Sequence, residues 1–362
     1  MAKMIRKVFL LLSVLNITIL AVAGCAMIKS SAPAVITPAF PDKYNNTYTQ
    51  TVSYSDTKVY LSDGSGGWTD VTPKNVTTGE SINCALFVDQ HDGWAAGCDP
   101  AGSCATITIY KTADGGRDWT PVTAEIQIGA GGPVEFDFVD VNNGWLVVSQ
   151  DEGAGQNAIS LLKTTDGGAT WAIISTNGLE SGSTPVPDCF PGHALIRFYD
   201  TKNGYATVDD ASGAVNLYAT NDGGVTWLQQ AVTPPEVSQN DWYNAYPPQF
   251  FLNGTGIMPV SCMPVSTAAA NASPDAANTM YFYMTSDAGK TWVLATPMTI
   301  TGLETPTPLY CFSPDGKRGY MTDGTSLFTL TDDTWAKMST DLHLTGEPML
   351  YTGSGAGWFI PS

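Results

Sequence analysis

The stretch KTTDGGATW, residues 163–171, returns along the chain with small changes. Related stretches are TADGGRDW at 112–119, TNDGGVTW at 220–227 and TSDAGKTW at 285–292, with a shortened TDDTW ending at Trp335. A catalytic site is built once in a chain, whereas a structural unit returns at intervals. The repetition therefore predicts that this phrase belongs to the fold.

A second signature alternates with the first. It places an aromatic residue before an acidic turn and a Gly-aromatic pair, as in FVDQHDGW at 87–94, FVDVNNGW at 138–145, FYDTKNGY at 198–205, FLNGTGI at 251–257 and FSPDGKRGY at 312–320. Each signature reads as a β-hairpin, because strand residues flank a turn of Asp, Asn and Gly. Two hairpins in series predict a four-stranded antiparallel sheet, and a period of roughly 40 to 65 residues is typical of β-propeller blades.

The two ends of the repeat are out of phase. SDGSGGW at 62–68 keeps only the first signature, and GSGAGWFI at 353–360 keeps only the second. Joined as one blade, they close the ring and remove the exposed sheet edges. The sequence thus predicts an all-β chain with a single six-bladed β-propeller over residues 57–362; seven blades are the alternative.

The opening phrase resembles the Asp-box, or BNR repeat, of sialidases and other propellers. Three copies match Ser/Thr-x-Asp-x-Gly-x-Thr-Trp in full, and one has Asp118 in place of Thr. An Asp can accept backbone N–H groups of its own turn, and a Trp can fill the space between sheets. We therefore expect structural roles, rather than ligand binding, for Asp114, Trp119, Asp166, Trp171, Asp222, Trp227, Asp287 and Trp292. Turn formation is likewise preferred over calcium binding for Asp89, Asp140 and Asp200.

The N-terminal residues predict export. Lys3, Arg6 and Lys7 precede an apolar run over 8–23, which ends in Val-Ala-Gly-Cys at 22–25. This ending resembles the lipobox of bacterial lipoproteins, which implies a signal peptide over 1–24, lipidation of Cys25 and a tether over 25–56. A plain signal peptide is the alternative. The protein is expected outside the cell membrane, or on the outer membrane if the host has one.

The charge balance limits the partners. Removal of residues 1–24 takes away three basic residues and no acidic ones, which changes the formal net charge from −18 to −21. Such a surface repels phosphate backbones, so nucleic acid is excluded as a partner. We expect a monomer without a cofactor or metal, attached to the membrane by its lipid alone.

Six cysteines follow Cys25. Cys98 and Cys104 flank a Pro-Gly turn in CDPAGSC and form the candidate disulfide, whereas the pairing of Cys84, Cys189, Cys262 and Cys311 stays open. A zinc site is the competing interpretation, but the chain lacks CxxC spacing with nearby histidines.

The longest loops fall on one face of the predicted propeller. They cover residues 175–193, 233–248 and 261–278. Their aromatic and polar side chains suit a glycan or a protein surface and give the candidate binding residues Trp242, Tyr243, Tyr246, Asp241, Glu180, Asp188 and His193. The alternative is that the aromatic residues only cap the core.

No catalytic constellation stands out in the sequence. A sialidase needs three converging arginines, and the mature chain has only Arg117, Arg197 and Arg318, of which only Arg197 falls in an inner strand. The repeats look most similar to the photosystem II assembly and stability factor propellers, which implies a non-catalytic role. We therefore expect a membrane-tethered scaffold for an envelope protein or glycan. The alternative is a secreted glycan hydrolase or lyase that uses the loop carboxylates Glu180, Asp188 and Asp241.

Overall fold

The structure is a computed structural model of the whole chain. It describes residues 52–55, 58–62, 68–74, 81–89, 91–98, 106–122, 126–127, 131–153, 156–177, 193–209, 214–235, 241–251, 254–263, 278–303, 309–313, 316–323, 326–338, 350–351 and 357–358. All of these belong to Val35–Ser362, the second of two compact units. The first unit, Met1–Ala34, holds the predicted signal peptide and Cys25 and lies outside the described residues.

The described part is almost entirely antiparallel β-sheet. The first three sheets are β1–β3 (Val52–Ser55, Lys58–Ser62, Trp68–Asp70), β4–β8 (Ser81–Phe87, Asp92–Cys98, Thr106–Ala113, Thr120–Pro121, Ile126–Gln127) and β9–β12 (Gly131–Phe138, Gly144–Gly153, Gln156–Thr164, Ala172–Asn177). The next two are β13–β16 (His193–Phe198, Gly204–Asp209, Asn216–Thr220, Leu228–Gln230) and β17–β22 (Trp242–Ala245, Gln249–Phe250, Gly256–Met263, Asn278–Thr285, Val293–Leu294, Ile300–Leu303). The last two are β23–β26 (Leu309–Phe312, Arg318–Thr322, Leu327–Thr331, Thr334–Lys337) and β27–β28 (Leu350–Tyr351, Gly357–Trp358).

Two strands of the fifth sheet are interrupted. β17 and β18 both pair with β19, and Pro247 and Pro248 lie between them, where a missing N–H would break the ladder. On the outer side, the 3-10 helix η1 (Thr296–Met298) separates β21 from β22. η1 is the only helix in the described ranges, and with three residues it cannot cross a bilayer.

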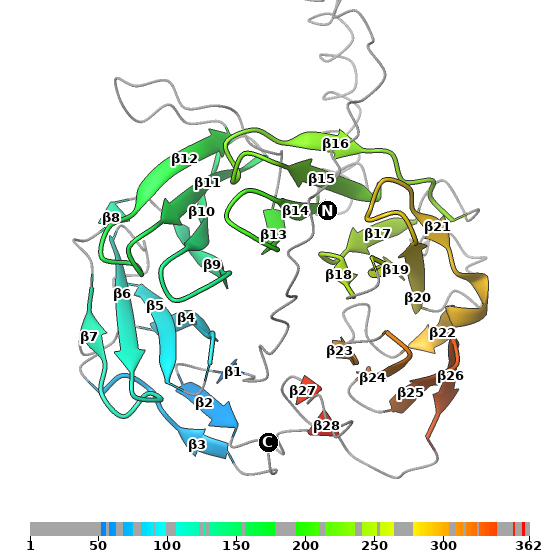
Figure 1. Cartoon of the computed structure of the whole chain (residues 1–362), viewed down its shortest axis with the longest axis horizontal. Coiled ribbons are helices and arrows are strands. Elements are labelled where there is room, and N and C mark those ends of the chain that lie inside the picture. Colours follow the sequence, from blue (N-terminus) through cyan, green and yellow to red (C-terminus); the bar gives the residue numbers. More distant parts are fainter. Residues whose placement is uncertain are drawn as a thin grey trace, which may run out of the picture. The chain divides into compact units, whose positions relative to one another are not determined.

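The sheets follow one another as blades of a β-propeller. The first strand of a sheet, here called its inner strand, contacts the inner strand of the next sheet: β1 contacts β4, β4 contacts β9, and β9 contacts β13. Figure 1 shows this succession, with the outer strands β7, β12 and β16 at the edge of each sheet opposite to its inner strand. The all-β propeller fold predicted from the repeats is confirmed.

The two ends of the propeller differ in detail from the prediction. β1 lies inside the segment assigned to the tether, so regular structure begins before residue 57. β1–β3 and β27–β28 form separate sheets in the described part of the chain, and β27 contacts β23. The six-blade count and the blade shared by both termini stay predictions.

Aromatic stacking joins neighbouring sheets. The Trp94 ring stacks on Phe138 of the next sheet at 3.8 Å, and Trp145 stacks on Phe198 at 3.6 Å, with interplanar angles of 12° and 2°. Gly144 must lack a side chain because a Cβ there would lie 2.4 Å from the Phe138 ring. The Gly-aromatic pair of the second signature therefore supplies both the stacking residue and the space for its own Phe.

The turn of the opening phrase is closed by its own side chains. Asp166 accepts hydrogen bonds from the Thr170 amide at 2.9 Å, the Thr170 hydroxyl at 2.6 Å and the Thr164 hydroxyl at 2.8 Å. Gly167 and Gly168 have φ angles of 71° and 88°, which residues other than glycine rarely adopt. Corresponding contacts recur around Asp114, Asp222 and Asp287.

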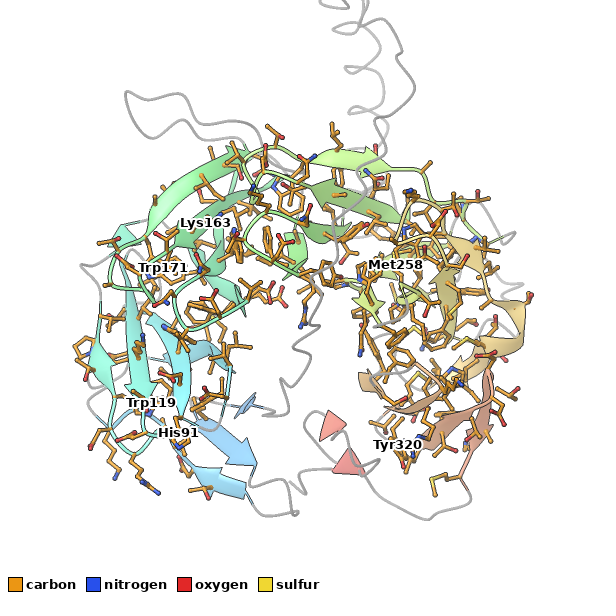
Figure 2. The ribbon with its side chains drawn as sticks, in the orientation of Figure 1. His91, Trp119, Lys163, Trp171, Met258 and Tyr320 are labelled. Carbon is orange, nitrogen blue, oxygen red and sulfur yellow. The ribbon has the colours of Figure 1, made fainter. Side chains whose placement is uncertain are left out.

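The same turns also connect the sheets. The indole N–H of Trp94 donates to the carbonyl of Gly167 at 2.9 Å, and that of Trp145 donates to Gly223 at 2.9 Å. Lys163, labelled in Figure 2, lies 4.9 Å from the Trp145 ring centroid and donates to the Thr201 carbonyl at 3.0 Å. Trp171 packs against the cluster that contains Trp94 and Phe138.

Candidate functional site

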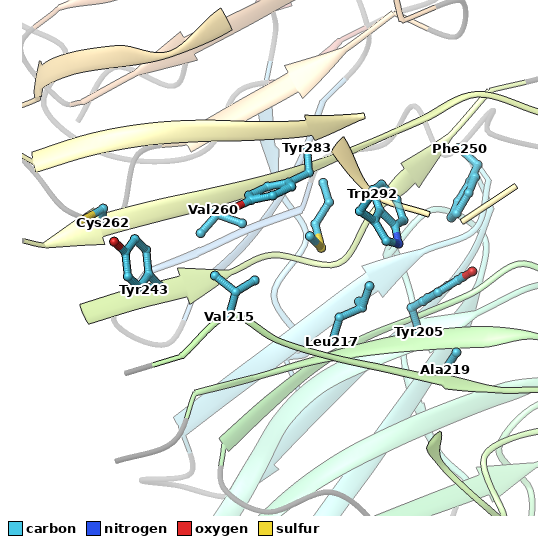
Figure 3. Packing of buried hydrophobic residues seen from close by; sticks show 11 residues of the cluster. Tyr205, Val215, Leu217, Ala219, Tyr243, Phe250, Val260, Cys262, Tyr283 and Trp292 are labelled. Carbon is cyan, nitrogen blue, oxygen red and sulfur yellow. The ribbon is translucent and has the colours of Figure 1, made fainter. Parts of the chain in front are cut away.

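The predicted binding residues separate into three groups. Glu180 and Asp188 lie outside the described residues, and His193 begins β13, with its side chain outside the description. Trp242 is 40% exposed, while Asp241 and Tyr246 are half-buried. Tyr243 is 6% exposed and packs beside Cys262 in the cluster drawn in Figure 3, so this aromatic residue is part of the core.

A different group of ionisable side chains lies on the inner strands. Glu135 and Asp137 are two residues apart on β9, so they share the face that is opposite to Phe136 and Phe138. Phe136 and Phe138 pack against the preceding sheet. The two carboxylates therefore lie at the inner edge of the boundary between sheets β9–β12 and β13–β16.

Both carboxylates cap the edge of β13. Glu135 accepts the Ile196 N–H at 2.9 Å through Oε2, and Asp137 accepts the Phe198 N–H through Oδ2. β13 pairs with β14 on one side only, so these N–H groups would otherwise have no strand partner. The two acids thus lie side by side on β9 because the edge of β13 needs two hydrogen-bond acceptors.

Their surroundings favour the protonated forms. Burial raises the pKa of Glu135 to about 7 and that of Asp137 to about 6, against the partial opposition of the Arg197 charge. The negative charge of Asp137 raises the Glu135 pKa further. Near neutral pH this pair can offer one carboxylic acid and one carboxylate, which is the arrangement required for acid–base catalysis.

Three further side chains belong to this group. Arg197 comes from β13 and is exposed, while Tyr310 comes from β23 and is half-buried. Burial and the neighbouring Tyr246 raise the Tyr310 pKa, and the charges of Arg197 and Glu135 also act on it. The Tyr246 and Tyr310 rings meet edge to face at 5.5 Å. We call Glu135, Asp137, Arg197, Tyr246 and Tyr310 the central cluster.

The carboxylates of the repeated turns, Asp114, Asp166, Asp222 and Asp287, have the opposite character. Hydrogen bonds from Thr170 lower the pKa of Asp166, and the Asp118 N–H does the same for Asp114. These acids are ionised and occupied by their own turns, so they do not suit proton transfer at neutral pH.

Only part of the central cluster could be predicted from the sequence. Tyr246 is among the predicted binding residues and Arg197 is the arginine predicted on an inner strand, whereas Glu135, Asp137 and Tyr310 were not predicted. The available signal was VEFDF at 134–138, because acids at alternate positions of an apolar strand conflict with strand preferences. Tyr310 carried no such signal, since Tyr is common in strands.

The two cysteines whose side chains the structure describes are free thiols. Cys84 and Cys262 are both buried, and burial raises the pKa of Cys262 to about 11. The candidate disulfide between Cys98 and Cys104 lies outside the described side chains and stays a prediction. Within the described ranges, no three His, Cys, Asp or Glu side chains gather as a metal site.

Comparison with known proteins gives one curated relative to consider. It is named a probable oligoxyloglucan-reducing end-specific xyloglucanase from Neosartorya fischeri, with 26% identity over 229 residues. The match covers 54% of this chain and 27% of the relative, so the chain spans about a quarter of that protein's length. No family model matches the chain.

Solved structures with a similar course of the chain have low identity. An α-L-arabinofuranosidase from Fusarium graminearum has 16% identity and a TM-score of 0.45, covering 78% of this chain and 89% of the other. YCF48 bound to a D1 peptide has 18% identity and a TM-score of 0.37, covering 77% and 89%.

The xyloglucanase relative contradicts the prediction of a non-enzymatic scaffold and favours the alternative, a glycan hydrolase. The prediction failed because it treated the lack of a recognisable catalytic motif as a sign of no catalysis. Acids on separate turns of a repeat, or on one inner strand, form no motif in the sequence.

Proposed function

We propose that this protein is a glycoside hydrolase that acts on a neutral polysaccharide of the xyloglucan type. The observation that carries the proposal is the pair Glu135 and Asp137, side by side on an inner strand with raised pKa values. The xyloglucanase relative supports the substrate class.

The chemistry follows from the two pKa values. Glu135, with the higher value, donates its proton to the glycosidic oxygen as the bond from that oxygen to the anomeric carbon breaks. Asp137, whose raised pKa of about 6 still leaves it ionised at neutral pH, accepts a proton from the attacking water or stabilises the positive sugar ring. Water supplies the hydroxyl of one product and, through Asp137, the proton lost by Glu135.

The charge of the chain favours a neutral substrate. A formal net charge of −18 for the full sequence repels pectin-like or sialylated glycans. Arg197 is the one cation of the central cluster, and two carboxylates lie beside it, which leaves little positive charge for a substrate carboxylate.

The test is the release of reducing ends from a panel of neutral and acidic polysaccharides. We expect turnover of neutral glucans and a loss of about 10²- to 10⁴-fold in Glu135→Gln, which keeps an acceptor for Ile196 N–H but has no acid. Asp166→Asn, which changes a turn carboxylate, is the matched control and should retain the rate. Equal rates in Glu135→Gln and the parent would refute the role of Glu135.

Export and lipid attachment at Cys25 complete the proposal. The lipobox resemblance at 22–25 supports it. Fractionation of cells should find the protein with the membrane, and Cys25→Ala should move it to the soluble fraction. An unchanged distribution would leave a plain signal peptide as the explanation.

A further inference from the structure

Trp242 and Asn244 of β17 and Tyr246, the first residue after that strand, alternate along the chain, and we call these three side chains the β17 stripe. Alternate residues of an extended chain share a face. Trp242 pairs with Met263 of β19, and the ladder continues to Tyr246, whose N–H donates to the Pro259 carbonyl at 2.9 Å. Tyr243 and Ala245 point the other way, into the core shared with sheet β13–β16.

The two ends of the stripe have different surroundings. Trp242 and Met263 are 40% and 43% exposed, although most large apolar side chains of the sheet are buried. Tyr246 is half-buried and, with Tyr310, packs against the hydrophobic cluster shared by sheets β17–β22 and β23–β26. The Glu135 charge acts on Tyr310. The stripe therefore leads from an exposed indole to the central cluster.

Its length and chemistry fit a sugar chain. Four residues of strand extend over about 13 Å, which is longer than one sugar ring. An exposed indole offers a flat apolar face for the C–H groups of a sugar, and the amide of Asn244 offers both a donor and an acceptor for hydroxyls. No lysine, arginine or acid is part of the stripe, so it suits an uncharged chain.

We infer that the β17 stripe binds the non-reacting part of a neutral oligosaccharide whose scissile bond lies at Glu135 and Asp137. This inference rests on the proposed function and adds a remote binding subsite to it. Occupation of Trp242 requires several sugar units, so affinity should rise with chain length.

Titration calorimetry with xyloglucan oligosaccharides of increasing length tests the stripe. The full mature protein carrying Glu135→Gln is used so that the ligand is not hydrolysed. Adding Trp242→Ala should weaken binding of the long oligosaccharides about tenfold and leave the short ones unchanged, and Trp242→Phe should recover most of the loss. Val293→Ala, at a 67% exposed apolar residue of the outer strand β21, is the matched control.

The outcomes separate the stripe from the proposed function. Length-dependent binding that needs Trp242, without hydrolysis by the parent protein, would uphold the stripe and remove the enzyme. Hydrolysis with equal affinities in folded Trp242→Ala and its parent would overturn the stripe alone. If Trp242→Ala fails to fold, the same comparison is made with Asn244→Ala. An absence of both binding and hydrolysis by the parent protein would overturn the stripe and the proposed function together.

Discussion

The Asp-containing turns keep the same residues and contacts from sheet to sheet, whereas the inner strands differ between sheets. In the turns, the same Thr, Asp and Gly contacts return in sheet after sheet. In the fifth sheet Phe250 pairs with Gly256 as Phe138 pairs with Gly144, so Phe250, and not Phe251, is the equivalent aromatic residue. On the inner strands, the residue before this aromatic changes each time: Leu86, Asp137, Arg197, Gln249 and Cys311. A residue that recurs with its contacts builds the fold, whereas a position that varies on a fixed scaffold is free to carry chemistry.

The largest effect on stability should come from the stacking residues that the repeat shares. Trp145→Ala removes a fully buried ring stacked on Phe198 and a hydrogen bond to Gly223. We expect a loss of about 3 to 5 kcal/mol in the free energy of unfolding, measured by urea denaturation. Ile173→Ala, at a residue 43% exposed, should cost less than about 0.5 kcal/mol. Similar costs for both would mean that the repeat aromatics do not hold the sheets together.

A smaller loss is expected at the turn carboxylates. Asp166→Ala removes the acceptor of three hydrogen bonds and should cost about 1 to 3 kcal/mol of unfolding free energy while the rate of hydrolysis is kept. Asp118→Ala is the matched change in another copy, where only the backbone N–H of residue 118 contacts the turn Asp, and it should be near neutral. A loss of hydrolysis in folded Asp166→Ala would move function into the turns.

The smallest expected effect is on the pH dependence of stability, which should distinguish the inner-strand carboxylates from those of the turns. The raised pKa values of Glu135 and Asp137 mean that the folded state binds more protons than the unfolded state between about pH 4 and 7. Stability from this pair is therefore complete below about pH 4 and is lost as pH rises through about 6 to 7. Melting curves of Glu135→Gln should fall less between pH 5 and 8 than those of the parent, and parallel curves would contradict the assignment.

More of the fold than of the candidate site could be predicted from the sequence. Gly144 with Phe138, and Asp166 with its Thr neighbours, act within a few residues of each other, so their roles appear as a local pattern. The central cluster joins β9, β13, β23 and the residue after β17, whose side chains meet only through the packing of sheets. The same limit applies to Tyr243, which lies in the core although its neighbour Trp242 is exposed.

The most direct test compares carboxylates on the inner strands with those on the long loops. Reducing-end release from xyloglucan would be measured for the parent and for Asp137→Asn, Asp188→Asn and Asp241→Asn. The account predicts a loss of about 10²- to 10⁴-fold in Asp137→Asn alone. A full rate in Asp137→Asn with a loss in either loop variant would contradict it and return the chemistry to the loops.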